Sequence, residues 1–167
     1  MNSETLNFIV TSVVIGVGAT LVMDIWALTL RKFLGIMPLN YGLVGRWAVH
    51  MGKGTFRHEN ISKAKPVRAE LLIGWTLHYL TGVIFAATLI MVLDNSWITT
   101  PSVFPAICFG ALTVGLPFFV MQPAMGLGIA ASKTPKPSVA RFRSVITHII
   151  FGFGLYLSAS MIGPHLS

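Results

Sequence analysis

Four long apolar stretches constrain this sequence more than any other feature. They run from about residue 8 to 30, 71 to 93, 103 to 131 and 145 to 162, and they contain one acidic residue and no Lys or Arg. A helix of about 20 apolar residues crosses the roughly 30 Å hydrocarbon core of a bilayer. We therefore expect an all-α membrane protein, a single domain (1–167) with four transmembrane helices in two hairpins.

The Lys and Arg residues predict how the chain is oriented. Eight of the twelve lie between the first and second stretches, and the other four lie between the third and fourth. Because cytoplasmic loops carry the excess of Lys and Arg, we expect both basic loops in the cytoplasm of a bacterium and both termini on the periplasmic side of its inner membrane. This pattern accounts for the net charge of +7, so the expected partner is the lipid bilayer and not nucleic acid.

A short amphipathic helix is predicted in the first cytoplasmic loop, from about residue 40 to 51, with Asn40 as its N-cap. One face carries Leu43, Val44, Trp47 and Met51, and the other carries Arg46, His50 and Lys53. The pattern is typical of an interfacial helix whose basic stripe faces anionic lipid. Arg46, His50 and the nearby His58 are candidates for contact with an anionic headgroup or a cytoplasmic partner. The alternative is a solvated basic face.

Each apolar stretch contains one Asp, His or Gln residue, at a similar distance from its cytoplasmic end. These residues are Asp24, His78, Gln122 and His148. Polar side chains in a membrane span are costly to expose to lipid, so we expect the four to turn inward and form a polar intramembrane cluster. Two interpretations remain open. The cluster is either a proton-relay, ion or metal site, or a set of hydrogen bonds that holds the helices together.

A haem or metal site is a more specific form of the first interpretation. His78 and His148 could ligate haem iron from two sides, or they could join Asp24 at a divalent metal. The sequence contains no Cys-x-x-Cys or His-Glu-x-x-His spacing. It also contains no nucleophile–base arrangement and no phosphate-binding glycine loop, so we do not expect an enzyme.

The third apolar stretch also contains residues that interrupt helices. Pro117 and Pro123 each lack a backbone donor, and Gly126 and Gly128 follow them. A broken helix can expose carbonyl groups to a cavity within the membrane. The alternative is a kink that serves only packing.

Four segments of the chain form a recognisable set: residues 43–51 (LVGRWAVHM), 54–61 (GTFRHENI), 74–82 (GWTLHYLTG) and 117–137 (PFFVMQPAMGLGIAASKTPKP). They resemble a family of small four-span bacterial inner-membrane proteins of unknown function. The resemblance covers nearly the whole chain and implies a four-span inner-membrane protein. It implies no reaction, substrate or ligand. It directs interest to the seven candidate residues already named, which fall in or beside these segments.

Three functions remain open on this sequence. The first is a small proton- or ion-coupled transporter or permease that acts as a homo-oligomer, with Asp24 as the coupling carboxylate. The second is an accessory or structural subunit of a larger membrane complex, which needs no catalytic residue. The third is a haem- or metal-handling membrane protein that uses His78 and His148.

Overall fold

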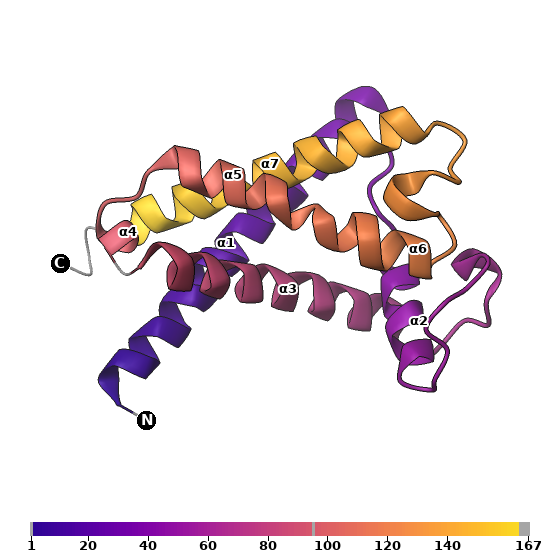
Figure 1. The fold of residues 1–167 in the computed structure, drawn as a ribbon, viewed down its shortest axis with the longest axis horizontal. Coiled ribbons are helices and arrows are strands. Elements are labelled where there is room, and N and C mark those ends of the chain that lie inside the picture. Colours follow the sequence, from indigo (N-terminus) through magenta and orange to yellow (C-terminus); the bar gives the residue numbers. More distant parts are fainter. Residues whose placement is uncertain (1, 95, 164–167) are drawn as a thin grey trace. The chain divides into compact units, whose positions relative to one another are not determined.

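The computed structural model describes residues 2–94 and 96–163, and every regular element in these residues is a helix (Figure 1). Four segments are long and apolar enough to cross a membrane: α1 (Ser3–Leu34), α3 (Glu70–Leu93), the segment Val103–Ala124, and α7 (Pro137–Ile162). The all-α membrane fold with four spans is therefore confirmed. The predicted domain covered the whole chain, and its residues 1, 95 and 164–167 lie outside the described residues.

The other elements are shorter, and some of them make up the interrupted third span, whereas the rest lie between spans. They are α2 (Tyr41–Met51), the 3-10 helix η1 (Ile61–Lys63), α4 (Ser96–Thr99), α5 (Val103–Thr113), the π-helix η2 (Pro117–Met121), α6 (Gln122–Ala124) and the 3-10 helix η3 (Ile129–Ala131). The predicted amphipathic helix is α2. Its N-cap is Asn40, whose side-chain oxygen accepts a hydrogen bond from the Gly42 N–H at 3.0 Å.

The third span ends earlier than the sequence pattern predicted. We expected it to continue to Ala131, but the structure ends the span at Ala124. Gly126 and Gly128 then have φ values of 90° and 75°, which a right-handed helix cannot contain. Apolar residues continue beyond this point, and composition alone therefore extended the prediction too far.

A π-helix interrupts the third span before it ends. The N–H of Gln122 donates to the carbonyl of Pro117, five residues earlier, instead of four as in an α-helix. Pro117 has no N–H of its own, so the α-helical pattern of hydrogen bonds is already broken at this point. The predicted interruption of the third span is thus present, and it places a wide helical turn directly before Gln122.

The described chain forms two compact units, of which the first contains most of the apolar spans. Among the described residues, unit 1 comprises 2–37, 79–94, 96–112 and 146–163, and unit 2 comprises 38–78 and 113–145. The centre of unit 1 is a cluster of buried side chains that includes Ile15, Ala19, Leu89, Phe151 and Leu155. Many other apolar side chains of this unit are exposed, among them Ile25, Met91, Phe104, Leu112 and Met161 at 62–77%. Such an outer surface suits lipid as the solvent.

Glycines let the helices of unit 1 approach closely. A Cβ atom on Gly16 of α1 would meet the backbone of Gly82 and Val83 in α3. A Cβ atom on Gly110 of α5 would lie 2.5 Å from the Cα of Gly152 in α7. Each predicted hairpin thus has one crossing at which two backbones touch. Small residues at such crossings are typical of membrane helices, which associate by packing because lipid removes the hydrophobic driving force.

Candidate functional site

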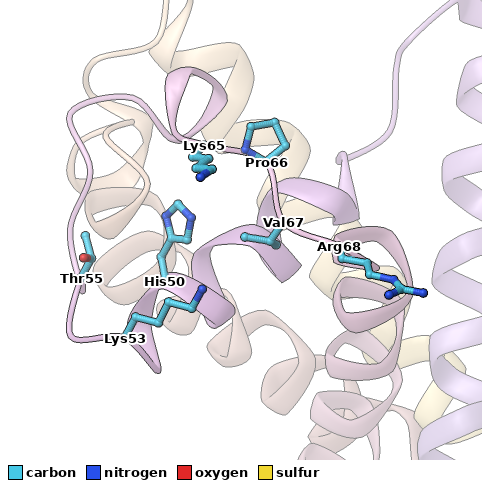
Figure 2. A pocket seen from close by; sticks show the side chains of 7 residues that line it. All are labelled: His50, Lys53, Thr55, Lys65, Pro66, Val67 and Arg68. Carbon is cyan, nitrogen blue, oxygen red and sulfur yellow. The ribbon is translucent and has the colours of Figure 1, made fainter.

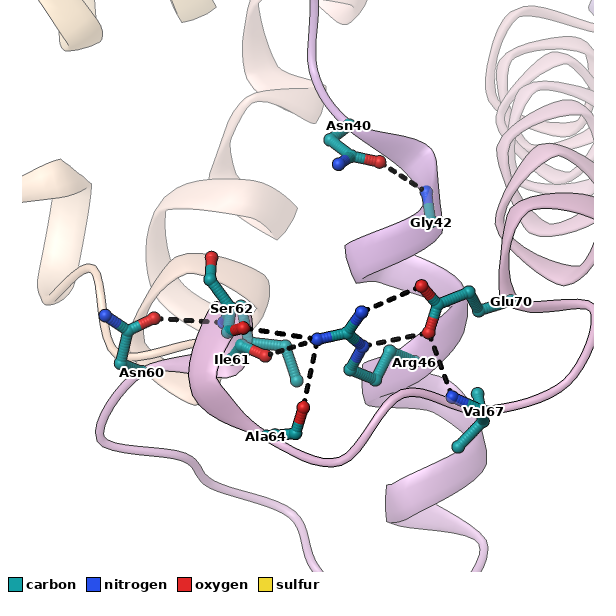
Figure 3. Close-up of polar contacts among 9 residues, drawn as sticks. All are labelled: Asn40, Gly42, Arg46, Asn60, Ile61, Ser62, Ala64, Val67 and Glu70. Carbon is teal, nitrogen blue, oxygen red and sulfur yellow. Dashed lines mark hydrogen bonds and ion pairs between the residues drawn. The ribbon is translucent and has the colours of Figure 1, made fainter.

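Arg46 of α2 is the centre of unit 2, and Figure 3 shows its contacts. The side chain is almost fully buried, with the residue 8% exposed. Its Nε and Nη2 atoms donate to the two carboxylate oxygens of Glu70 at 2.9 and 2.8 Å. Its Nη1 atom donates to the carbonyls of Ile61, Ser62 and Ala64 at 3.3, 3.3 and 3.0 Å. One guanidinium therefore joins α2, the η1 segment and the start of α3.

The Arg46–Glu70 ion pair is completed by the backbone. Glu70 also accepts a hydrogen bond from the Val67 N–H at 3.1 Å, so its carboxylate fixes the turn that leads into α3. The hydrogen bonds to Glu70 raise the pKa of Arg46 above its usual value, against the opposite effect of burial. The prediction that Arg46 faces anionic lipid is wrong. A carboxylate 24 residues away in the sequence pairs with it instead.

Direct backbone contact between α2 and the first turns of α3 accompanies this ion pair. A Cβ atom on Gly45 would meet the Glu70 carbonyl, and one on Gly74 would meet the Tyr41 carbonyl. His78 lies one helical turn after Gly74, and its Nε2 atom is 2.9 Å from the Tyr41 hydroxyl. The rings of Tyr41 and His78 stack, with their centroids 4.3 Å apart. His78, predicted to belong to an intramembrane polar cluster, thus has a hydrogen-bond partner on α2.

His50 and His58 form a second feature of unit 2. Their ring centroids are 5.1 Å apart. Burial lowers the pKa of His58, and the neighbouring His50 adds to this effect. The backbone N–H of His58 donates to the Ala124 carbonyl at 2.8 Å, and the backbone N–H of Ile61 donates to the Met125 carbonyl at 3.2 Å. The loop after α2 is therefore bound along its backbone to the end of the third span.

Two buried polar atoms at this junction have no hydrogen-bond partner within residues 2–94 and 96–163. One is Nε2 of His58, and the other is Oε1 of Gln122, a residue that is only 7% exposed. Gln122 lies two residues before Ala124, which accepts from the His58 N–H. A buried polar atom without a partner is costly, and such atoms are uncommon outside sites that bind water or a ligand. The sequence identified both residues as candidates.

The other two members of the predicted cluster belong to unit 1. Oδ2 of Asp24 on α1 accepts a hydrogen bond from the Tyr79 hydroxyl of α3 at 2.8 Å. His148 lies in α7, where its backbone carbonyl faces Gly110. Asp24 and His148 are thus in unit 1, whereas His78 and Gln122 are in unit 2. That the four side chains meet stays a prediction.

The metal hypothesis required three ligands that lie together. Among the residues that the structure describes, no three side chains of His, Cys, Asp or Glu lie close enough to hold a metal ion. The predicted metal site of Asp24, His78 and His148 and the two-histidine haem site stay predictions.

Several residues that matter in this structure had no distinct signal in the sequence. Tyr79 and Tyr41 are aromatic residues in or beside apolar segments, where aromatic residues are common, and nothing in their spacing indicated a polar partner. Glu70 had a usable signal, because it is the acidic residue nearest to the start of the second span. Its partner could not be identified from the sequence, because distance along the chain does not show which of the eight basic residues in that loop lies beside Glu70.

The match with known families covers most of the chain. A family model described as "Protein of unknown function (DUF2938)" matches residues 13–162. Comparisons with curated proteins and with solved structures gave no match.

Removal of Arg46 should loosen unit 2. In an Arg46→Gln variant, Glu70 and three carbonyls lose their buried partner, which typically costs about 3 kcal/mol or more. We expect the free energy of unfolding in a detergent titration to fall by that amount, and trypsin to cleave faster after Lys53 and Lys63. Arg141→Gln is the matched control, because its side chain donates to the Ala130 carbonyl at an exposed position. Equal stability of the two variants would contradict the role given to Arg46.

The half-buried imidazole of His58 should make unit 2 less stable in acid. Its pKa in the folded protein lies below the ordinary value of about 6.5. Its contribution to stability is therefore present above pH 6.5 and is lost as the pH falls through the lowered pKa. We expect the thermal unfolding temperature to drop between pH 7.5 and pH 5, and a His58→Gln variant to lose part of that drop. His50→Gln removes only the smaller cause of the lowered pKa and should reduce the drop by less. An unchanged pH profile for His58→Gln would be the contrary result.

Proposed function

We propose that this chain, which belongs to the DUF2938 family of proteins of unknown function, is a small proton- or ion-coupled transporter rather than an enzyme. It acts as a homo-oligomer in the bacterial inner membrane. Both basic loops face the cytoplasm, and both termini face the periplasm, as the distribution of Lys and Arg favours. Asp24 is the coupling carboxylate.

The Asp24–Tyr79 hydrogen bond is the observation that carries this proposal. Both residues lie within membrane-spanning helices, and Asp24 is the one acidic residue in the four apolar stretches. It lies seven residues before Arg31, which corresponds to about 10 Å of helix. An ionisable side chain at such a depth is costly, and natural spans that retain one commonly use it to bind an ion or to carry a proton.

The interruption of the third span supports the same proposal. Its π-helix directly precedes Gln122, whose buried Oε1 atom has no hydrogen-bond partner in the described part of the chain. Interrupted helices in transporters direct free backbone and side-chain groups at the transported species. Four helices enclose little space, so we infer that the pathway is completed by a second copy of the chain.

An Asp24→Asn variant separates transport from a purely structural role. The Asn side-chain oxygen can still accept the hydrogen bond from Tyr79, but it cannot ionise. We expect wild-type protein on solid-supported membranes to give transient currents after concentration jumps of H⁺, Na⁺ or K⁺. The Asn variant should fold normally and give currents no larger than those of protein-free membranes.

Glu4→Gln is the matched control, because Glu4 is an exposed carboxylate in the first turn of the same helix. It should leave the currents unchanged. If Asp24→Asn gave wild-type currents, or if the wild-type protein gave none with any of the three ions, the proposal would be wrong.

A further inference from the structure

A cavity of about 440 Å³ lies in unit 2, on the side of α2 that carries His50 (Figure 2). This volume is within the range of about 300–1,000 Å³ that is common for small-molecule sites. The lining side chains include His50, Lys53, Thr55, Lys65, Val67 and Arg68. Among the described residues that line it, three are Lys or Arg and none is acidic. The cavity therefore favours an anion.

The backbone holds the first wall of this cavity in place. The N–H groups of Lys53 and Thr55 both donate to the His50 carbonyl, at 3.0 and 2.9 Å. The chain after α2 is thereby folded back, so that these side chains stand beside the His50 ring. His50, which belongs to this wall, also contacts the ring of His58, with the ring centroids 5.1 Å apart.

The Arg46 contacts hold the second wall. The Ala64 carbonyl accepts from Arg46 on one side of Lys65, and the Val67 N–H donates to Glu70 on the other. Pro66 between them has a restricted backbone. The carboxylate of Glu70 is occupied by Arg46, and within residues 2–94 and 96–163 Lys65 forms no ion pair.

Figure 2 shows which cations can act together. The side chains of His50, Lys53 and Lys65 gather in one part of the cavity, whereas the guanidinium of Arg68 points away from them. Lys53 and Lys65 are both exposed, so a ligand can reach them from outside. Two ammonium groups, an imidazole and a hydroxyl together provide several donors for one compact group with three or four acceptor oxygens, such as a phosphate.

We propose that this cavity binds a phosphate-bearing anion through Lys53, Lys65, His50 and Thr55. The phosphate comes either from the headgroup of an anionic phospholipid or from a soluble phosphate compound. The first source is available because the cavity wall at Arg68 lies two residues before the membrane-spanning helix α3. The site does not depend on the proposed transport role, since none of its residues is Asp24, Tyr79 or Gln122.

The test uses the full chain in nanodiscs and has two arms. In the first, native mass spectrometry measures how much phosphatidylglycerol remains bound to the protein after release from mixed phosphatidylcholine–phosphatidylglycerol discs. In the second, discs of phosphatidylcholine alone are titrated with inorganic phosphate, and the shift in thermal unfolding temperature is followed. Binding in the first arm alone identifies the lipid headgroup, and binding in the second arm identifies the phosphate group itself.

The variant pair Lys53→Gln and Lys65→Gln, made together, should weaken binding roughly tenfold or more, because two cations near the anion are lost. Lys133→Gln with Lys136→Gln is the matched control, since it removes the same charge from exposed lysines that do not line the cavity. Lys53→Arg with Lys65→Arg should keep the binding. The proposal is overturned if neither arm detects binding, if both Gln pairs weaken it equally, or if the Arg pair loses it as well.

Discussion

The ion pair between Arg46 and Glu70 is the interaction on which the polar part of this structure depends. A buried guanidinium is stable only if its donors are satisfied, and here a bidentate carboxylate and three carbonyls satisfy them. The same contacts determine where the loop after α2 lies and how α3 begins. That loop then donates from His58 and Ile61 to the end of the third span. One side chain thus organises two segments that are distant in the sequence.

The apolar part of the structure is held together in a different way. Between 17% and 33% of the most apolar stretch of each span is buried, so most of each helix surface is left for lipid. The helices of unit 1 meet at glycines, where backbones come into contact. Packing at a few close crossings therefore replaces the large apolar core that a soluble protein of this size would need. The hydrogen bond between Tyr79 and Asp24 lies within these apolar spans.

Local features of this fold could be predicted from the sequence, and non-local ones could not. The four spans follow from apolar length, and α2 follows from its cap and periodicity. The end of the third span could not be predicted, because the positive φ values of Gly126 and Gly128 cannot be read from composition. Lipid-facing helices also carry no polar face that would reveal their rotation, so the sequence could not show which neighbour Asp24 contacts.

The candidate residues show the same difference between local features, which the sequence predicts, and non-local contacts, which it does not. Sequence reasoning selected His58 and Gln122 as polar residues, and both have buried atoms without a partner in the described chain. It assigned Arg46 to the lipid surface because an amphipathic pattern describes one helix and not what packs against it. Glu70 reverses that assignment by bringing an opposite charge from the start of α3. The cavity beside Lys53 and Lys65 likewise results from a folded loop that no periodic pattern describes.

The most direct test of this account is hydrogen–deuterium exchange of the wild-type protein in a bilayer, resolved over residues 52–70. If Arg46 and the end of the third span hold this loop, the amides of His58, Ile61 and Val67 should exchange much more slowly than those of an unstructured peptide. Their protection should approach that of α2. Exchange of the whole segment at the rate of a free peptide would contradict the account, because the cavity and the His58–Ala124 contact both require an ordered loop.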